Sequence, residues 1–553
     1  MRKHREETRF TGTEKSWIAY DWANSVYATN IMAAIFPIYY ASVANDLGNK
    51  WWGIGVSIAS LICALLAPTL GAIADFRGYK KKLLFAFIVI GVTFTAAMAF
   101  AGTWQLMLVG YVISRIGFSG SCVFYDSFLT DVTTSERMDR VSAWGYAMGY
   151  LGGSTIPFVI SIVALLLSDF SVPAIKFSIL ITSVWWAVFS IPILKNVEQK
   201  HYVQTPPSQL AHMAGRNLLY TMKECVTNKG LLIYLLAYFF YIDGVGTIIT
   251  LSTNYGATLG LGATGMILAL LVTQLVAVPF SILFSKLAAK FGSIRMIIVA
   301  IAVYFGICGV GFFMGRAVEP YQLAYTQQVR DAAAQQTVCA EGTSDYKTWQ
   351  AVVADLVEQG KDVLAEQDRP AAFAGVFETI VKRLNDVRGT VYAFSDAGAR
   401  RNAIAAVGKI EQELAPYVND VPLQAGYHAA RRTASMLFWV LAAMVGTVQG
   451  GIQALSRSYF GKLVPQERSA EYYGFYDIFG KFAAVIGPLL YAVCYMITDR
   501  PSIGLMSLII LFGAGGILLL AGGKQLRLTE ERMRRTRQLQ AENGEADPSS
   551  ICN

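Results

Sequence analysis

The feature that most constrains this chain is a series of apolar runs, each about 20 residues long, that recurs along most of its length. A run of this length is what an α-helix needs to cross roughly 30 Å of hydrocarbon. A backbone in lipid must satisfy its own hydrogen bonds, and runs this long do so as helices rather than as barrel strands. Only 15% of the 553 residues are charged, against roughly a quarter in a soluble domain. The sequence therefore predicts an all-α integral membrane protein.

We expect about twelve transmembrane helices in two bundles of six. The predicted spans lie near 17–43, 51–74, 83–102, 104–129, 141–167, 174–194, 231–255, 262–288, 294–315, 433–456, 471–496 and 502–522. Every second short loop is rich in Lys and Arg, and loops of this kind face the cytoplasm. Both ends of the chain fall in the basic set. Both termini are therefore expected to be cytoplasmic, in a protein of the plasma (inner) membrane.

The same pattern divides the chain into seven parts. They are a cytoplasmic tail (1–16), a first six-helix bundle (17–194), a cytoplasmic linker (195–230), three helices of a second bundle (231–318), an extracytoplasmic insertion (319–432), the last three helices of that bundle (433–522) and a basic cytoplasmic tail (523–553). Apolar residues of the insertion follow the helical period from Phe373 to Val387 and again from Ile404 to Tyr417. The insertion is therefore predicted to be a small helical hairpin or bundle.

A basic loop with two glycines follows the second span and returns in weaker form after the eighth. The copies read Gly71-Ala-Ile-Ala-Asp75-Phe-Arg77-Gly78-Tyr-Lys80-Lys81-Lys82 and Ser285-Lys-Leu287-Ala288-Ala289-Lys290-Phe-Gly292. Gly71 and Gly78 permit a tight turn and a close approach of helices. Because the frame recurs six spans apart, we interpret the two halves of the chain as copies of one six-helix unit.

With this loop the chain resembles the major facilitator superfamily, whose hallmark is a G-x-L-A-D-R-x-G-R-K loop after the second span. Within span four, Arg115-Ile-Gly117-Phe-Ser-Gly120 is similar to the family's arginine and the glycines that follow it. Two further segments resemble the vacuole-effluxer-like branch of this superfamily, which contains autophagy-related amino-acid effluxers. These are Tyr20-Asp21-Trp22-Ala23-Asn24-Ser25-Val-Tyr27-Ala-Thr29 and Ala454-Leu-Ser-Arg457-Ser-Tyr-Phe460.

The resemblance implies two bundles that rock around a central cavity lined by spans one, four, seven and ten. It also implies that Asp75 pairs across the bundle interface on the cytoplasmic side. Gly71, Asp75, Arg77, Gly78 and Lys80 would then form a gating loop. The alternative is a loop whose basic residues only fix the topology. The resemblance covers the membrane portion and leaves out the insertion.

Ionisable side chains inside spans cost at least about 2.5 kcal/mol each, so each one requires a role. Arg115 in span four is our candidate ligand for a substrate carboxylate, with a structural ion pair as the alternative. Asp243 in span seven is our candidate proton or substrate-amine site. It is flanked by Gly244 and Gly246, and we expect its helix to break there. Further candidates for substrate or proton contact are Asp21, Trp22, Asn24, Tyr27 and Asp126.

Several classes of function lack support. The net charge of +8 is spread between the apolar runs rather than gathered into one patch, which argues against nucleic-acid binding. Neither a G-x-x-x-x-G-K-[ST] loop nor an H-E-x-x-H helix occurs, and the seven cysteines show no metal-ligand spacing. We therefore expect no enzyme, with no catalytic residue, cofactor or metal. The four histidines lie outside the spans, so carboxylates would carry any coupled proton.

The leading hypothesis is a monomeric secondary transporter for a small-molecule substrate, an amino-acid-like zwitterion, with a proton as the candidate coupling ion. One alternative is a lipid or lysolipid flippase, which would need an apolar cavity open sideways to the bilayer. The other is a membrane sensor or scaffold that uses the outer insertion and does not transport.

Overall fold

The computed structural model describes residues 9–44, 46–168, 171–203, 220–336, 338–365, 382, 384–418 and 421–542. Within these ranges the chain is helical, and its one β feature is an isolated bridge between Phe76 and Val203. Eleven helices are long and apolar enough to cross a membrane. The predicted all-α membrane class is therefore confirmed.

The first predicted span is also helical, although it is not among these eleven. Gly12–Val26 (α2), Tyr27–Ala34 (η1, a π-helix) and Ile35–Val43 (α3) follow one another without a break. A capping box starts α2, because the Thr11 hydroxyl accepts the Glu14 N–H and the Glu14 carboxylate accepts the Thr11 N–H. Further along, buried Asn30 donates to Ser161 Oγ at 3.1 Å and to Thr182 Oγ1 at 3.0 Å. With this polar helix included, the number of membrane helices agrees with the prediction.

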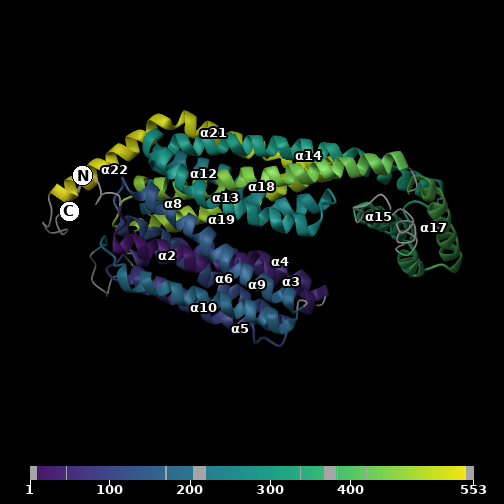
Figure 1. The fold of residues 1–553 in the computed structure, drawn as a ribbon, viewed down its shortest axis with the longest axis horizontal. Coiled ribbons are helices and arrows are strands. Elements are labelled where there is room, and N and C mark those ends of the chain that lie inside the picture. Colours follow the sequence, from purple (N-terminus) through teal and green to yellow (C-terminus); the bar gives the residue numbers. More distant parts are fainter. Residues whose placement is uncertain are drawn as a thin grey trace.

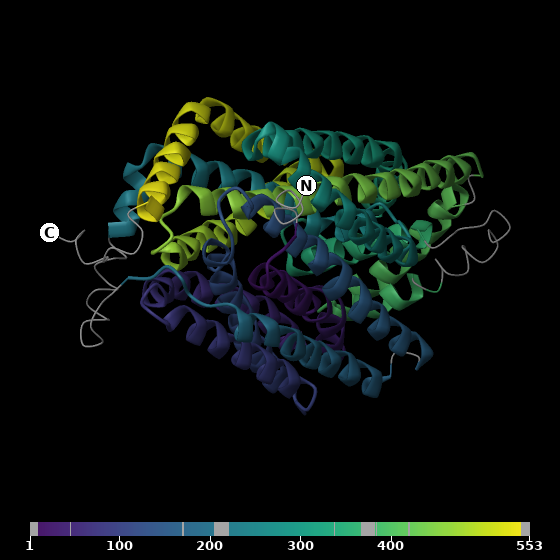
Figure 2. The same ribbon diagram turned by 60° about the vertical axis from the view of Figure 1, so that its left-hand side comes forward.

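The helices form two bundles that lie side by side (Figure 1). The first contains α2 to α3, Asp46–Ala74 (α4), Tyr79–Met98 (α5), Trp104–Ser127 (α6), Leu129–Val132 (α7), Met138–Met148 (α8), Gly149–Thr155 (η2), Ile156–Leu167 (α9) and Val172–Asn196 (α10). The second contains Lys229–Thr258 (α12), Ala263–Phe291 (α13), Ser293–Gln335 (α14), Val421–Leu463 (α18), Ser469–Thr498 (α19), Pro501–Ser507 (α20) and Ile509–Ala521 (α21). The turned view in Figure 2 shows the same separation of purple and blue helices from teal, green and yellow ones.

Each bundle has its own aromatic-rich core and an apolar outer surface. Trp17, Tyr20 and Trp186 are fully buried in the first bundle, and Tyr241 and Tyr304 in the second. Large apolar side chains remain on the outside, and these are the side chains that hydrocarbon would cover: Leu65, Leu167, Phe313 and Met496 are each more than 60% exposed.

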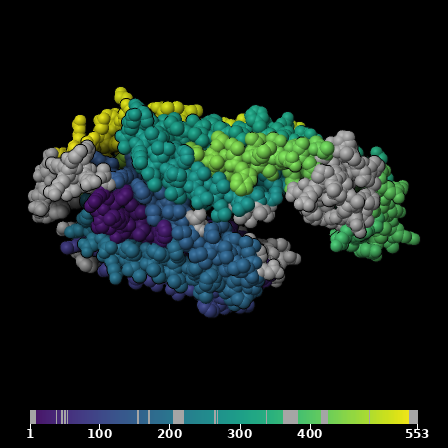
Figure 3. Space-filling view, viewed as in Figure 1, coloured from purple at the N-terminus to yellow at the C-terminus, as the bar shows by residue number. Residues whose placement is uncertain are grey.

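The insertion is helical where it is described. Helices α14 and α18 each have 43 residues, or roughly 64 Å, which is about twice the hydrocarbon thickness. Their outer parts form a stalk that carries a head made of Ser344–Ala365 (α15), Gly389–Ala393 (η5) and Ala397–Val418 (α17) (Figure 1). The predicted helical segment around Phe373 lies outside the described residues. In the space-filling view of Figure 3 the head stands away from the first bundle.

The end of the molecule opposite the head carries the start of α2 and the last helix, Gly523–Glu542 (α22) (Figure 1). We call this the termini end, and the opposite end the insertion end. Helix α22 packs against α12 and α18. There Arg537 donates to the carbonyl oxygens of Gly461 and Val464, both at 2.8 Å, and also to Ser135 of the first bundle.

Candidate functional site

At the termini end, Asp75 connects the first bundle to the second. Its two carboxylate oxygens accept the backbone N–H groups of Ala470 and Glu471, each at 2.9 Å. These amides belong to the first turn of α19, where a carboxylate is a favourable cap. Burial raises the pKa of Asp75 to about 8. Gly71 lies in the same contact, because a Cβ there would be 2.4 Å from the Ala470 carbonyl oxygen.

Lys80 makes a second connection from the same loop. Its ammonium group donates to Asp131 Oδ2 and to Ser469 Oγ, both at 2.8 Å. The Lys80 and Asp131 side chains are fully buried. Since Ser469 begins α19, both Asp75 and Lys80 hold the N-terminus of that helix.

The turn of this loop depends on backbone that favours glycine. Gly78 has a φ of +78°, and Gly292 in the second copy of the loop has a φ of +93°. Both copies thus place a glycine at a positive φ, but the ψ angles of −3° at Gly78 and 144° at Gly292 show that the two turns differ. Arg77 instead faces the linker, where its guanidinium lies 5.4 Å from the centre of the Tyr202 ring.

We call the contact that Asp75 and Lys80 form with α19 the first corner of the interface. A second corner, at the second copy of the loop, contains Asp139 of α8. Its carboxylate accepts from Lys462 Nζ at 2.6 Å, Ser458 Oγ at 2.6 Å and Ser293 Oγ at 2.8 Å. All three donors belong to the second bundle. This corner therefore also crosses the interface, with the acid supplied from the opposite bundle.

Between the two corners, Arg457 of α18 reaches from the second bundle into the first. Its guanidinium donates to Asp21 Oδ2 at 3.1 Å, Asp126 Oδ1 at 3.0 Å and Ser142 Oγ at 2.9 Å. The Arg457 side chain is only 3% exposed. A buried arginine cannot lose its charge, so it requires these acids or an anion.

Three aromatic rings of the first bundle surround the same guanidinium. Its carbon lies 4.4 Å from the centre of the Tyr146 ring, 4.7 Å from Trp17 and 5.3 Å from Tyr125. These distances are within cation–π range. The Tyr125 hydroxyl also donates to Asp21 at 2.7 Å.

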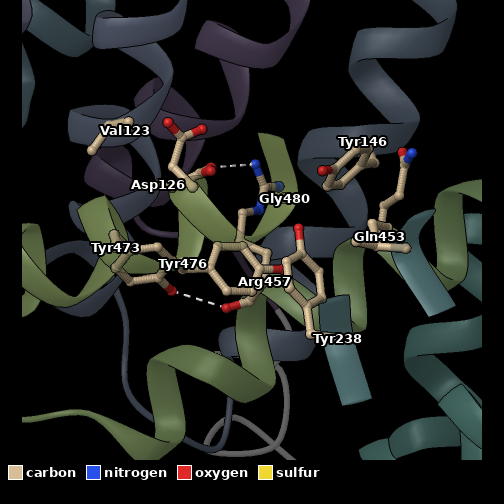
Figure 4. A pocket seen from close by; sticks show the side chains of 11 residues that line it. Val123, Asp126, Tyr146, Tyr238, Gln453, Arg457, Tyr473, Tyr476 and Gly480 are labelled. Atoms are coloured by element: carbon tan, nitrogen blue, oxygen red, sulfur yellow. Dashed lines mark hydrogen bonds and ion pairs between the residues drawn. The ribbon is translucent and has the colours of Figure 1, made fainter. Parts of the chain in front are cut away.

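A cavity of about 170 Å³ opens beside Arg457 (Figure 4). Figure 4 shows Asp126 bonded to the guanidinium and the Tyr473 hydroxyl bonded to the Arg457 carbonyl, the latter at 2.9 Å. The wall combines both bundles and is rich in tyrosine: Val123, Asp126, Tyr146, Tyr238, Ile242, Gln453, Arg457, Tyr473, Tyr476, Asp477 and Gly480.

The charges around this cavity do not cancel. Asp477 pairs with Lys481 one turn further along α19. With Arg457 and Lys481 as cations and Asp21, Asp126 and Asp477 as anions, two positive and three negative charges leave a net charge of −1. The cavity can therefore accept a carboxylate at Arg457 and an ammonium group or a proton at a carboxylate.

Asp21 and Asp126 are thus brought together, but Arg115 and Asp243 lie elsewhere. Arg115 donates to Tyr111 Oη at 2.8 Å, is absent from the cavity wall and has no carboxylate partner among the described residues. Asp243 lies within the second bundle, where both its oxygens accept the Gly487 N–H, at 2.9 and 3.0 Å.

The predicted break in the helix at Asp243 is wrong, because α12 runs unbroken from Lys229 to Thr258. A Cβ at Gly244 would lie 2.7 Å from Phe512 Cζ. This glycine therefore serves close packing against α21 rather than a bend.

The other candidates of span one pack inside the first bundle. Trp22 stacks on Trp185 with ring centres 5.8 Å apart, and Tyr27 shares a 2.7 Å hydrogen bond with Ser114. The Asn24 amide faces Cys122 Sγ at 3.7 Å. None of the three lines the cavity beside Arg457.

Sequence reasoning missed Arg457 as a site residue, because the predicted span ends at residue 456 and Arg457 falls in the basic loop after it. One signal was available: Arg457 follows Gly450-Gly451-Ile-Gln453-Ala454-Leu-Ser without an intervening proline or charged residue. A second signal was that neither Asp21 nor Asp126 has a basic residue at the i+4 position of its own helix. A cation that pairs with these acids therefore had to come from another helix.

Comparisons with known proteins identify the family and the fold. The chain is 37% identical over 525 residues to YxiO, an uncharacterized MFS-type transporter of Bacillus subtilis (strain 168), over 92% of this chain and 95% of that one. It is 37% identical over 86 residues to autophagy-related protein 22 of Coccidioides immitis (strain RS), over 15% and 14% of the two chains. The fold is similar to that of the MFS proton:xylose symporter XylE, with a TM-score of 0.52 and 9% identity over 92% of this chain and 94% of that one.

Two bundles, a repeated loop and buried charges between them define a multi-pass membrane transporter of the major facilitator type. Residues 54–133, 130–317 and 433–524 match the family described as Vacuole effluxer Atg22 like, and the chain belongs to that family. The match leaves out 318–432, which contains the insertion.

Proposed function

We propose that this protein is a secondary active transporter that carries a small amino-acid-like zwitterion by alternating access. The observation that carries the proposal is Arg457, a cation of the second bundle held by Asp21 and Asp126 of the first, at the wall of a cavity between the bundles. A substrate carboxylate would compete with these acids for Arg457, and its ammonium group would take the place of Arg457 at Asp126. Binding would thereby loosen the contact that joins the bundles.

The cavity wall favours this substrate over a lipid. A flippase would need an apolar cavity open to the side, whereas this wall carries four tyrosines, two carboxylates and a guanidinium. We place the termini end in the cytoplasm, because the basic short loops lie at that end. The plasma membrane is the proposed location.

Asp126 is the proposed proton carrier. Its side chain is 26% exposed, and it pairs with Arg457 through one oxygen. The second oxygen is thus available to a proton or a substrate. Asp243 remains the alternative carrier, although both of its oxygens already accept the Gly487 N–H.

The test is uptake of radiolabelled amino acids into proteoliposomes with an imposed pH gradient. We expect Arg457→Gln to abolish uptake of every zwitterion. We expect Asp126→Asn to abolish the dependence of uptake on the pH gradient. Asp243→Asn should leave this dependence in place. Arg115→Gln is the control for loss of a half-buried arginine of a span outside the cavity wall. If Arg457→Gln protein transports as well as the wild type, the proposal fails.

A further inference from the structure

The cavity beside Arg457 has one carboxylate more than a zwitterion requires. Asp126 pairs with Arg457, and Asp477 pairs with Lys481 one turn further along α19. Both acids line the cavity, and they are close enough to interact electrostatically. A zwitterion has a single ammonium group, so it would leave one of the two acids without a contact to the cargo.

Each of the two acids keeps one carboxylate oxygen that accepts no hydrogen bond from the described residues. Asp126 binds Arg457 through Oδ1, and Asp477 binds Lys481 through Oδ2. The two acidic side chains are 26% and 25% exposed. Because both residues line the cavity, Asp126 Oδ2 and Asp477 Oδ1 can accept from the ammonium groups of a ligand there.

Lys481 does not belong to the wall of this cavity. It lines a separate, smaller cavity of about 10 Å³, together with Cys63 of α4 and Phe87 of α5. The acid of the Asp477–Lys481 pair therefore faces the cavity beside Arg457, while its cation lies outside that cavity. A ligand can thus reach Asp477 without displacing Lys481.

The charges and the aromatic rings of the wall both favour one additional positive charge. Two positive and three negative groups give a net charge of −1, and a buried charge without compensation is costly. Four tyrosines line the wall, and aromatic rings attract cations. The ionisable groups around Asp126 and Asp477, among which only the arginine and the lysine are cations, are Asp21 of α2, Cys63 of α4, Cys122 of α6, Tyr146 of α8, Tyr238 of α12, Arg457 of α18, and Tyr473, Tyr476 and Lys481 of α19.

Two kinds of cargo can supply this charge in different ways. A zwitterion is neutral overall, so a proton must accompany it to balance the cavity. A small diamino acid has one carboxylate and two ammonium groups, and it brings the positive charge itself. The cavity of about 170 Å³ is larger than the ~150 Å³ that accommodates benzene, so a short-chain diamino acid fits it.

We propose that the cavity also takes small diamino acids, with the carboxylate at Arg457 and the two ammonium groups at Asp126 and Asp477, and that these cargoes move without a proton. This inference rests on the proposed function and adds a second substrate class to the same site. It makes Asp477 the residue that distinguishes diamino acids from monoamino acids.

Two cargoes with the same carbon chain test the proposal, because α,γ-diaminobutyrate differs from α-aminobutyrate by one amine. Uptake of each radiolabelled cargo is measured in proteoliposomes that contain the full-length protein and an internal pH-sensitive dye. Wild-type protein should bring in a proton with each aminobutyrate and none with diaminobutyrate. A membrane potential, negative inside, should drive both, because each loaded cavity gains one positive charge.

A double variant tests the role of Asp477. Asp477→Asn combined with Lys481→Gln removes an anion and a cation together, so the net charge of the cavity stays at −1 and no lysine loses its acid. We expect the affinity for diaminobutyrate to fall roughly tenfold to a hundredfold more than that for aminobutyrate. The matched control removes an ion pair of the head, Arg388→Gln with Glu411→Gln, and should not change the ratio of the two affinities.

Three results would overturn the inference. They are no uptake of diaminobutyrate, a proton carried with diaminobutyrate as with aminobutyrate, or an equal loss of both affinities in the double variant. If aminobutyrate enters with its proton and diaminobutyrate does not enter, the proposed function stands and this inference alone fails. If the wild-type protein transports neither cargo, the proposed function fails and this inference fails with it.

Discussion

The two corners of the bundle interface at the termini end both join the bundles, but they do so through different chemical groups. In the first corner, Asp75 and Lys80 come from the repeated loop and hold the start of α19. In the second corner the loop has Ala289 in place of the acid. There the acid is Asp139 of the opposite bundle, and its cation is Lys462.

The difference shows that the two loops share a glycine at the turn but differ in backbone and in charge. Gly78 and Gly292 both have a positive φ, but their ψ angles are −3° and 144°, so the two turns are not alike. The first corner joins the bundles through a carboxylate with backbone amides and through Lys80 with Ser469. The second joins them through an ion pair and two hydroxyls. The corners should therefore respond differently to substitution and to pH.

The largest difference should follow loss of the lysines. Lys80→Met removes the lysine from the fully buried Asp131, which keeps the backbone N–H groups of Lys200 and His201 and the His201 ring as partners. We expect a loss of about 3 kcal/mol in the free energy of unfolding. Lys462→Met leaves Asp139 with two serine donors and some exposure, so we expect about 1–3 kcal/mol. Thermal unfolding in detergent measures both. Equal losses would show that the corners are equivalent.

A pH effect should come from the first corner. The pKa of Asp75 is about 8 when buried, against an ordinary value of 3.8. The closed corner thus binds the proton more tightly than the open one, is most stable below pH 3.8 and loses stability as the pH rises through 8. We expect spin labels at the exposed positions Lys82 and Lys524 to move apart between pH 6 and pH 9 in the wild type.

Asp75→Asn, which cannot ionise, should remove this pH dependence. Asp139→Asn should leave it in place, because it changes only the second corner. A pH-dependent label distance that persists in Asp75→Asn protein would assign the effect to another group.

Gly292→Ala should cost more than Gly78→Ala. Neither added Cβ would meet another atom within 4 Å, so the backbone decides the cost. Gly78 has the left-handed conformation (φ 78°, ψ −3°), which costs an alanine roughly 1–2 kcal/mol. Gly292 (φ 93°, ψ 144°) lies in a region that is nearly restricted to glycine, and we expect a loss of up to about 3 kcal/mol. Unfolding measurements on the two single variants check this, and equal losses would contradict it.

The smallest effect should come from restoring the missing acid. Ala289 is exposed, so Ala289→Asp should change the free energy of unfolding by less than about 0.5 kcal/mol. A strong stabilisation would instead reveal that the second loop can still cap a helix of the other bundle. Thermal unfolding of the single variant is sufficient to decide.

The sequence was enough to predict the membrane class and the family, whereas the gating role of the loop at Gly71 to Lys80 stays a prediction. These rest on local patterns, namely run length, basic loops and repeated glycines. Partners distant in sequence could not be predicted. Asp21 and Arg457 are 436 positions apart, and no periodicity within one helix relates them. Gly244 suggested a bend because its packing partner, Phe512, is also far away along the chain.

Arg115 shows the same limit of sequence-based prediction for a residue that proved not to line the cavity. An arginine at the middle of a span predicts a buried charge with a role, but its direction depends on which neighbours the helix meets. The polarity of the first span was visible in the sequence, although the partners of Asn30 on α9 and α10 were not.

Helix α18 runs without interruption from the head to Arg457. The 36 positions between Val421 and Arg457 correspond to a rod of roughly 54 Å. If the head end pivots by 5°, the other end of such a rod moves by about 5 Å, which exceeds the length of an ion pair. A displacement of the head would therefore be transmitted along α18 to the ion pairs that Arg457 forms with Asp21 and Asp126.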